Sequence, residues 1–246
     1  MNQFPSWQFD EMKQIGKDYA DLTEVEAFDA FHSKFRNVEK ENEAIIKTLS
    51  LQEDHTIIEF GTGTGAFAIQ AAACARQIYA VDVSRAMLDY ASRKAEKKGL
   101  TNILFCHGGF LSYRHAAAPV DCIVTSFALH HLPDFWKGVA LRRLNAILKP
   151  EGRLFLYDVV YSGENDEANI KAWISNQESA GGQEAVEDVE MHIREEYSTL
   201  TWIMESLLER AGFRIDSVKY DQGVLAQYVC TKMADGAKFI SSQGEQ

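Results

Sequence analysis

Three glycines at alternate positions, Gly61, Gly63 and Gly65, form the stretch of this sequence with the clearest chemical meaning. They follow Thr56–Phe60, whose mostly β-branched or aromatic residues are typical of a buried parallel strand, and they precede the helix-forming run Ala66–Ala73. A glycine loop at a helix N-terminus exposes free backbone N–H groups, and a ligand can approach closely because no Cβ atom intervenes. The spacing therefore predicts a loop that binds a cofactor.

An acidic side chain closes the next predicted strand, Gln77–Asp82. Its distance from the glycines suits a carboxylate that binds the ribose hydroxyls of a nucleotide. The loop also satisfies the dinucleotide pattern, with Ala66 in the last place, so an adenosine-sulfonium ligand and NAD both remain possible at this point. Asp82 could instead serve only as a cap for the helix that starts at Ser84 or Arg85.

Two adjacent histidines, His130 and His131, follow the fourth predicted strand and are the best candidates for a general base. The carboxyl ends of the strands face the ligand in a parallel sheet, and imidazole titrates near neutrality. The same pair could instead shape the turn by holding backbone carbonyls. Other side chains that could face a second substrate are Tyr157, Asp158, His192, Glu195 and Tyr197.

The sequence predicts no metal site. His130, His131 and His192 could meet in space, but their spacing matches no metal-ligand motif. The four cysteines are Cys74, Cys106, Cys122 and Cys230. They show no CxxC spacing and mostly fall within apolar strand or helix patterns, so we interpret them as buried thiols without a metal or redox role.

Composition and charge restrict the possible partners. The 246 residues carry a formal net charge of −11, which argues against nucleic acid or an anionic membrane as a partner, because both attract clustered Lys and Arg. No N-terminal apolar segment is present, and no run approaches the about 18 apolar residues of a membrane-spanning helix. We therefore expect a cytoplasmic protein that acts on a small molecule.

Strand and helix patterns alternate along the middle of the chain, with short turns between them. This order predicts an α/β fold with a Rossmann-like, doubly wound, mostly parallel sheet. An antiparallel C-terminal strand is expected because two strands follow the last helix closely. The predicted strands are Thr56–Phe60, Gln77–Asp82, Asn102–Cys106, Val120–Ser126, Arg153–Val160, Phe213–Tyr220 and Gln227–Thr231.

We predict five segments from these patterns. They are a helical N-terminal cover or lid at 1–50, a cofactor-binding core at 51–160, a helical insertion over the active site at 161–198, a closing helix and strand pair at 199–233, and a tail at 234–246. The cover is rich in aromatic residues, and Asn37 is expected to cap its second helix. It could be a fixed cover, or a lid that excludes water and adds Tyr19, His32 or Arg36 to the site.

Four segments together resemble class I S-adenosylmethionine-dependent methyltransferases of the small-molecule type. Ile58–Gly65 matches the glycine motif of that family, including the acid two places before the first glycine, and Val81–Ser84 with Met87 matches its ribose-binding acid and the following turn. Phe127–Asp134 resembles the segment after the fourth strand, and Leu148–Leu154 resembles the turn into the fifth. The match covers residues 54–160 well and the closing elements in outline.

The resemblance implies S-adenosyl-L-methionine as the cofactor and S-adenosyl-L-homocysteine as the product. The residues implied to contact the cofactor are Glu59, Gly61, Thr62, Gly63, Gly65, Asp82, Val83, Met87, Gly109, Phe110 and Ser126, with Tyr19 from the cover. In many relatives the third strand ends in Gly-Asp, whose carboxylate accepts a hydrogen bond from the adenine amino group, whereas this chain has Gly108-Gly109. Phe110 is expected to compensate through its backbone N–H or its ring.

The implied chemistry is simple. A sulfonium methyl group is already activated, so its in-line transfer to an O, N, C or S nucleophile needs alignment, exclusion of water and sometimes a base. The resemblance therefore implies methyl transfer to a small molecule, with His130 or His131 as an auxiliary base. The alternatives are a NAD-dependent oxidoreductase that uses the same loop and a non-catalytic protein that binds S-adenosylmethionine.

Overall fold

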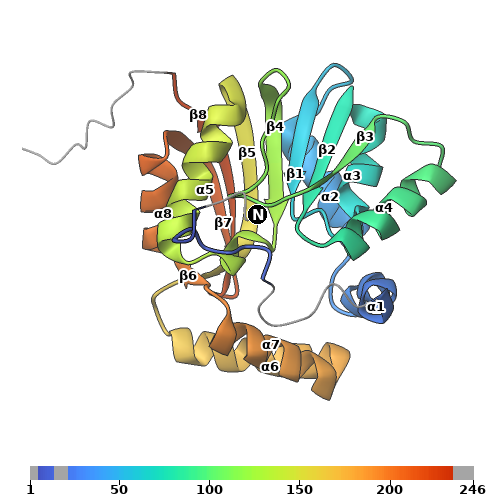
Figure 1. The fold of residues 1–246 in the computed structure, drawn as a ribbon. Helices are drawn as coiled ribbons and strands as arrows, with labels where there is room; N and C mark the ends of the chain where they lie inside the picture. The colour runs from blue at the N-terminus through green and yellow to red at the C-terminus, as the bar shows by residue number, and fades with distance from the viewer. Residues whose placement is uncertain (1–4, 14–21, 235–246) are drawn as a thin grey trace, which may run out of the picture.

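The fold is built on one sheet with the strand order β3-β2-β1-β4-β5-β8-β7, as seen in a computed structural model that describes residues 5–13 and 22–234 (Figure 1). Strands β1 to β5 are parallel, and β8 runs antiparallel between β5 and β7. The strands are β1 (Thr56–Phe60), β2 (Gln77–Asp82), β3 (Ile103–His107), β4 (Val120–Ser126), β5 (Leu148–Tyr161), β6 (Thr199–Leu200), β7 (Phe213–Asp221) and β8 (Leu225–Lys232). The predicted fold class is confirmed.

Helices cover both faces of the sheet (Figure 1). One face packs against α2 (Val38–Leu49), α3 (Ala66–Ala71) and α4 (Arg85–Lys97), and the other against α5 (Asp134–Ile147) and α8 (Thr201–Arg210). Strand β1 shows why both faces are covered, because it is buried along its whole length. Ile57 packs in the core on the side of α2, α3 and α4, and Ile58 and Phe60 pack in the core on the side of α5 and α8. A strand that is apolar on both sides requires two layers of helices.

Strand β1 lies between β2 and β4, so the order of the strands reverses beside it. At its end, Phe60 is paired with Val81 on one side and with Thr125 on the other. Ligands in open α/β sheets bind beyond the carboxyl ends of the strands at such a point. The topology therefore places the glycine loop, Asp82 and the segment after β4 around one crevice.

Three helices lie beyond this edge of the sheet, where Figure 1 shows α6 and α7 side by side below the strands and α1 next to them. They are α1 (Leu22–His32), α6 (Asp166–Gly181) and α7 (Gln183–Glu195). Trp173 of α6 and Val189 of α7 pack with Val159 and Val224 in a small apolar cluster that joins this pair to the sheet. Within residues 5–13 and 22–234, no helix has the length and the apolar run that crossing a bilayer requires.

Several predicted boundaries differ from the structure. The run Ala66–Ala73 is helical only to Ala71 and continues as a 3-10 turn, η1 (Ala72–Cys74). Strand β5 begins at Leu148 instead of Arg153, because Leu148 pairs with Val120 before a bulge separates it from the rest of the ladder. Cys122 and Cys230 are buried as predicted, whereas Cys74 and Cys106 are only partly buried; all four are free thiols.

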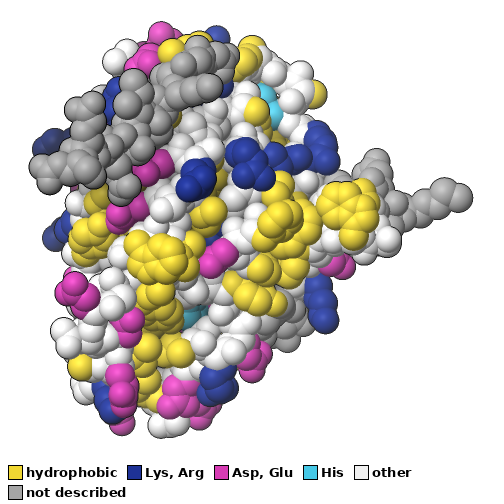
Figure 2. All heavy atoms as spheres, turned by 90° about the vertical axis from the view of Figure 1, so that its left-hand side faces the viewer, with side chains coloured by type: hydrophobic (Ala, Val, Ile, Leu, Met, Phe, Trp, Pro, Cys, Tyr) yellow, Lys and Arg dark blue, Asp and Glu magenta, His cyan; other side chains and the backbone are white. Residues whose placement is uncertain are grey.

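Hydrophobic side chains gather among charged ones on the outer surface beside α5 and α8 (Figure 2). Trp7 stacks on Trp136 of α5, with the ring centroids 6.3 Å apart, and the rings of Phe9 and Tyr197 meet edge to face with centroids 6.0 Å apart. These contacts lay the N-terminal segment, residues 5–13, across α5. Glu11 consequently reaches the crevice at the carboxyl edge of the sheet.

Candidate functional site

Two of the three loop glycines are required by close packing. A Cβ atom on Gly61 would lie 2.4 Å from the Cβ of Ala128, and one on Gly65 would lie 2.8 Å from the Cβ of Ala91. Both glycines also have positive φ angles, of 72° and 75°, which other residues rarely adopt. The loop is therefore packed closely against the segment after β4 and against α4.

Asp82 ties this loop to the end of β2. Its carboxylate accepts hydrogen bonds from the backbone N–H of Gly63 at 2.8 Å and of Ser84 at 2.8 Å. The N-cap of α4 is Ser84 itself, whose hydroxyl accepts from the N–H of Met87, so Asp82 is not the helix cap. Burial raises the pKa of Asp82, although the backbone hydrogen bonds oppose this shift.

Glu59 lies beneath the loop and is 6% exposed. Its carboxylate accepts a 2.6 Å hydrogen bond from the hydroxyl of Thr62. Burial outweighs that hydrogen bond and raises the pKa of Glu59 to about 8. The side chain is therefore mainly protonated at pH 7 and would ionise if a positive charge came close.

A cavity of about 1300 Å³ opens along the carboxyl edge of the sheet. The predicted residues that line it are Glu59, Gly61, Thr62, Asp82, Val83, Met87, Gly109, Phe110, Ser126, His130, His131, Tyr157, His192, His32 and Arg36. Gly63 and Gly65 are part of the loop but are not among the described residues that line the cavity, and Tyr19 lies outside the described residues. The glycine loop and the helices α1, α6 and α7 therefore line one cavity.

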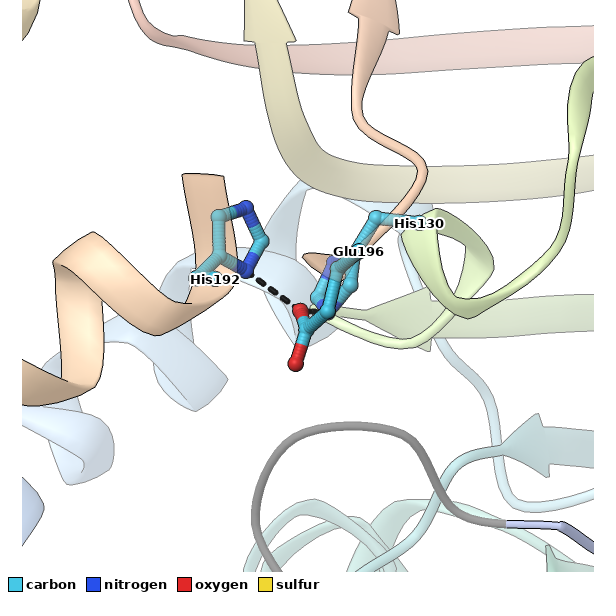
Figure 3. A group of neighbouring side chains, drawn as sticks. All are labelled: His130, His192 and Glu196. Atoms are coloured by element: carbon cyan, nitrogen blue, oxygen red, sulfur yellow. Dashed lines mark ion pairs between the residues drawn. The ribbon is translucent and has the colours of Figure 1, made fainter. Parts of the chain in front are cut away.

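A network of histidines and carboxylates forms the end of this cavity next to α7 (Figure 3). Nδ1 of His130 lies 2.5 Å from Oδ1 of Asp158, and Nε2 of the same ring lies 3.1 Å from Oε2 of Glu196. Nδ1 of His192 lies 2.5 Å from that same oxygen of Glu196. Residues from η2 (Leu129–His131), β5 and the end of α7 therefore meet at one point.

The two adjacent histidines have opposite electrostatic environments. Burial alone would lower the pKa of His130, but the carboxylates of Asp158 and Glu196 outweigh it and raise the pKa to about 9. Burial and the neighbouring His130 lower the pKa of His131 to about 4. At neutral pH His130 is therefore a cation between two carboxylates, and His131 is a neutral imidazole that can accept a proton.

Asp158 anchors the short helix that carries the histidines. Besides the contact with His130, its carboxylate accepts hydrogen bonds from the backbone N–H groups of Leu129 at 2.9 Å, His130 at 3.1 Å and Val159 at 2.8 Å. The side chain is 1% exposed. Burial would raise the pKa of Asp158, but His130 outweighs it and holds this pKa below its usual value.

Glu196 was missed by the sequence analysis, which named its neighbours Glu195 and Tyr197. Glu195 is exposed on α7, and Tyr197 donates its backbone N–H to the carbonyl of His130 at 2.9 Å. The spacing of His192 and Glu196, four residues apart at the end of a helix, was the available signal, because such residues lie on the same helix face.

The segment after α7 is fastened firmly to the rest of the fold. Lys137 is 1% exposed, and its ammonium group donates to the carbonyl of Tyr197 and to Asp134. Thr199 bonds to the same Asp134 at 3.1 Å and begins β6, which pairs with the end of β5. The position of Glu196 is therefore fixed from both sides.

Glu11 was also missed, although it fills the position of the acid that is absent after β3. Its carboxylate accepts hydrogen bonds from the N–H of Leu111 at 2.9 Å and of Ser112 at 2.6 Å. A Cβ atom on Gly109 would lie 2.5 Å from Oε2 of Glu11. The ring of Phe110 stacks on Phe60, which commits one face of that ring to the core.

Helix α1 bridges the glycine loop and α4 through one side chain. Asp29 accepts a 2.5 Å hydrogen bond from the hydroxyl of Thr64 and pairs with Lys94 at 2.6 Å. Beyond the helix, the guanidinium of Arg36 lies 4.2 Å over the ring of Phe127 and pairs with Glu41. The N-terminal cover therefore contacts the glycine loop directly. A fixed cover and a lid would both make this contact.

Comparisons with known proteins identify similar chains. Residues 57–152 match the family described as a methyltransferase domain. An uncharacterized methyltransferase of Geobacillus kaustophilus is 27% identical over 205 residues, which cover 81% of this chain and 90% of that protein. One from Bacillus pumilus is 28% identical over 180 residues, covering 73% and 79%.

Solved structures share the fold at low sequence identity. A S-adenosylmethionine-dependent methyltransferase from Clostridium acetobutylicum has a TM-score of 0.66 at 11% identity and covers 86% of this chain and 98% of its own. The complex of the Haloferax volcanii Trm112 methyltransferase activator with a putative methyltransferase contains a chain with a TM-score of 0.67 at 13% identity, covering 90% and 100%. These likenesses show that the fold is shared.

Proposed function

Because this chain is a class I S-adenosylmethionine-dependent methyltransferase, we propose that it methylates a small molecule bound in the same cavity as the cofactor. The observation that carries the proposal is the single cavity of about 1300 Å³, which joins the glycine loop to the network of His130, His192 and Glu196. Pockets for drug-sized ligands have volumes of roughly 300–1000 Å³, so this cavity has room for the cofactor and a small acceptor together. The net charge of −11 supports an acceptor other than nucleic acid.

The loop end of the cavity fits the cofactor. When bound, S-adenosyl-L-methionine supplies a methyl group activated by its sulfonium charge. We place its ribose at the carboxylate of Asp82 and its positively charged end near Glu59, because these buried acids line the same part of the cavity. The remaining predicted contacts are Gly61, Thr62, Val83, Met87, Gly109, Phe110 and Ser126, with Gly63 and Gly65 shaping the loop and Tyr19 as a further candidate.

Glu11 is proposed to accept the hydrogen bond of the adenine amino group, since its carboxylate occupies the position beside Gly109. Glu11→Ala is expected to weaken binding of S-adenosyl-L-homocysteine by roughly 1.5–3 kcal/mol, the usual loss for a hydrogen bond to a charged group. Isothermal calorimetry measures this, with Glu53→Ala, an exposed glutamate before β1, as the matched control. Equal affinity of the two variants for S-adenosyl-L-homocysteine would show that Glu11 does not bind the cofactor.

Binding of the cofactor is expected to release a proton from Glu59. Its pKa is about 8 in the free protein, and a sulfonium or ammonium group nearby favours the carboxylate and lowers that value. At pH 7 most cofactor-binding events should therefore release a proton, and affinity should rise with pH until the pKa of the free carboxyl is passed. Calorimetry in buffers of different ionisation enthalpy counts these protons. Glu59→Gln should abolish the release; a release that survives in this variant comes from another group.

The N-terminal cover is expected to become more protected when the cofactor binds. Asp29 holds α1 to Thr64 of the glycine loop, so ordering of the loop should order the helix as well. Hydrogen exchange measured with and without S-adenosyl-L-homocysteine should show slower exchange in residues 22–36. Asp29→Ala should lose most of this change. Equal exchange in both states would identify a fixed cover.

We place the auxiliary base at His131. Its side chain lines the cavity and is 36% exposed, so a bound acceptor can reach it. The lowered pKa leaves the imidazole unprotonated at neutral pH but also makes it a weak base, so its contribution should be small. His130, the other histidine predicted for this role, already carries a proton between two carboxylates. Aligning the acceptor with the sulfonium is the main requirement, and a base adds to it when the acceptor is not already anionic.

Transfer of an isotope-labelled methyl group to a panel of small-molecule hydroxyls, amines and thiols tests the proposal. S-adenosyl-L-methionine and S-adenosyl-L-homocysteine should each bind one site per chain, and NAD should not bind. Labelled product is expected from at least one acceptor class, with lower turnover in His131→Ala and cofactor affinity within a few fold of the wild type. Label that appears only on protein or nucleic acid would overturn the small-molecule assignment.

A further inference from the structure

We propose that His130, His192 and Glu196 form a binding site for one divalent transition-metal ion. One ligand atom from each residue lies within 4.8 Å of the others. Figure 3 shows the two imidazole rings on either side of the carboxylate, His130 from the turn after β4 and His192 from the last turn of α7. Two imidazoles and a carboxylate are a common ligand set for zinc and for iron(II).

The outer contacts of both histidines support this assignment. A metal-bound histidine nearly always engages its second ring nitrogen with a carboxylate, a carbonyl or a similar partner, which fixes the tautomer and the orientation of the ring. Here Nδ1 of His130 is held by Asp158 at 2.5 Å, and Nε2 of His192 lies 2.8 Å from the hydroxyl of Ser198. The two remaining nitrogens, Nε2 of His130 and Nδ1 of His192, are the ones that face Glu196.

Oε2 of Glu196 lies between the two rings and forms ion-pair contacts with Nε2 of His130 and Nδ1 of His192. This oxygen is buried, and among the described residues it has no hydrogen bond of regular geometry. A bound cation would take the place of the proton that these groups share, because imidazole and carboxylate bind a metal in their deprotonated forms. Asp158, in contact with His130, adds a second negative charge to the neighbourhood of the ion.

The site is open on one side only. His130, His192 and Glu196 all line the large cavity, as does His131, whose Nδ1 lies 3.9 Å from Oε1 of Glu196. Away from the cavity, buried Asp158 contacts His130, and buried Lys137 holds the carbonyl of Tyr197, the residue after Glu196. Three protein ligands with an open position are characteristic of metal sites that bind a substrate atom. The open position would take an oxygen, nitrogen or sulfur donor of a molecule in the cavity.

Without a metal, the same contacts would form a network of side chains that share protons. Titration of the protein with a metal ion distinguishes this network from a metal site. The full chain is treated with a chelator, dialysed and titrated with Zn²⁺ by calorimetry, and with Co²⁺ by its visible absorption. One equivalent of Zn²⁺ is expected to bind, and Co²⁺ should give the intense visible absorption bands of a four-coordinate site. Neither measurement needs an acceptor or methyl transfer, so failure here is distinct from failure of the proposed function.

Variants locate the ion. His192→Ala and Glu196→Gln should each weaken Zn²⁺ binding by roughly 100-fold or more, and Ser198→Ala, which removes only the outer contact, by about 10-fold. His115→Ala, a histidine that does not line the cavity, serves as the matched control and should bind as the wild type does. Binding of S-adenosyl-L-homocysteine and the far-ultraviolet dichroism verify that each variant is folded. Less than a tenth of an equivalent in the wild type, or Zn²⁺ affinity unchanged in both folded ligand variants, would overturn the site.

Discussion

Replacing Asp158 with alanine is expected to lower the free energy of unfolding by about 3–5 kcal/mol, the usual cost of leaving one partner of a buried ion pair alone. The substitution removes the acceptor of three backbone N–H groups and leaves the imidazolium of His130 buried without its closest carboxylate. Urea denaturation measures the change. Asp158→Asn keeps the shape of the side chain and one acceptor oxygen, so its free energy of unfolding should fall distinctly less than that of Asp158→Ala.

The pH dependence of this effect gives an independent check. The pKa of His130 is raised from 6.5 to about 9 in the folded protein, so its contribution to stability is complete below pH 6.5 and is lost as the pH rises through 9. The pKa of Asp158 is lowered, so its contribution is lost only as the pH falls below the ordinary aspartate range. The difference between the wild type and Asp158→Ala should therefore be largest near pH 6 and smaller at pH 9. A difference below about 1 kcal/mol at pH 6 would contradict the proposed role of the pair.

Replacing Asp82 with alanine is expected to weaken cofactor binding by about 1.5–3 kcal/mol, roughly 10- to 150-fold, if its carboxylate takes both ribose hydroxyls. The variant also loses the hydrogen bond that holds Gly63, which adds to the cost because the loop must be ordered when the cofactor binds. The fold should survive, since the residue ends a strand and the hydroxyl of Ser84 still caps α4.

Calorimetry with S-adenosyl-L-homocysteine measures the loss, and Asp82→Asn separates its causes. The amide oxygen of asparagine can still accept from Gly63 but carries no charge, so this variant should show a smaller loss of affinity than alanine. Unchanged affinity in a folded Asp82→Ala protein would show that the ribose is not bound by this side chain and that Asp82 serves only the loop and the turn.

The parts of the fold that the sequence predicted correctly are those determined by local residues. Strands Thr56–Phe60, Gln77–Asp82 and Val120–Ser126 have the predicted bounds, because buried parallel strands require continuous apolar residues and end at glycine or polar residues. Strand β6 could not be predicted, since two residues carry no periodicity and pair with β5 only because Lys137 and Asp134 hold the segment in place.

The predicted site was incomplete for a similar reason. Glycines and acids of the cofactor half are close in sequence, so their spacing alone indicated a common role. Glu196 lies 66 positions after His130, and only the packing of α7 on the sheet brings them together. Glu11 lies about a hundred positions before Leu111, and these two residues also meet only because the chain is folded. Contacts of this kind depend on tertiary structure, which no local pattern of residues records.

The contacts of Lys137 bear on the route by which substrate and product enter and leave the cavity. By holding the carbonyl of Tyr197 it joins α5 to the end of α7, while β6 and the apolar cluster around Trp173 fasten the same insertion to the sheet. Helix α1, by contrast, is tied to the glycine loop and to α4 through partly exposed Asp29, and the turn after it is tied to α7 through the exposed pair Lys34 and Glu184. If the N-terminal cover is a lid, substrate and product should therefore exchange on the side of α1, and the opening of that helix would be a step that can limit turnover.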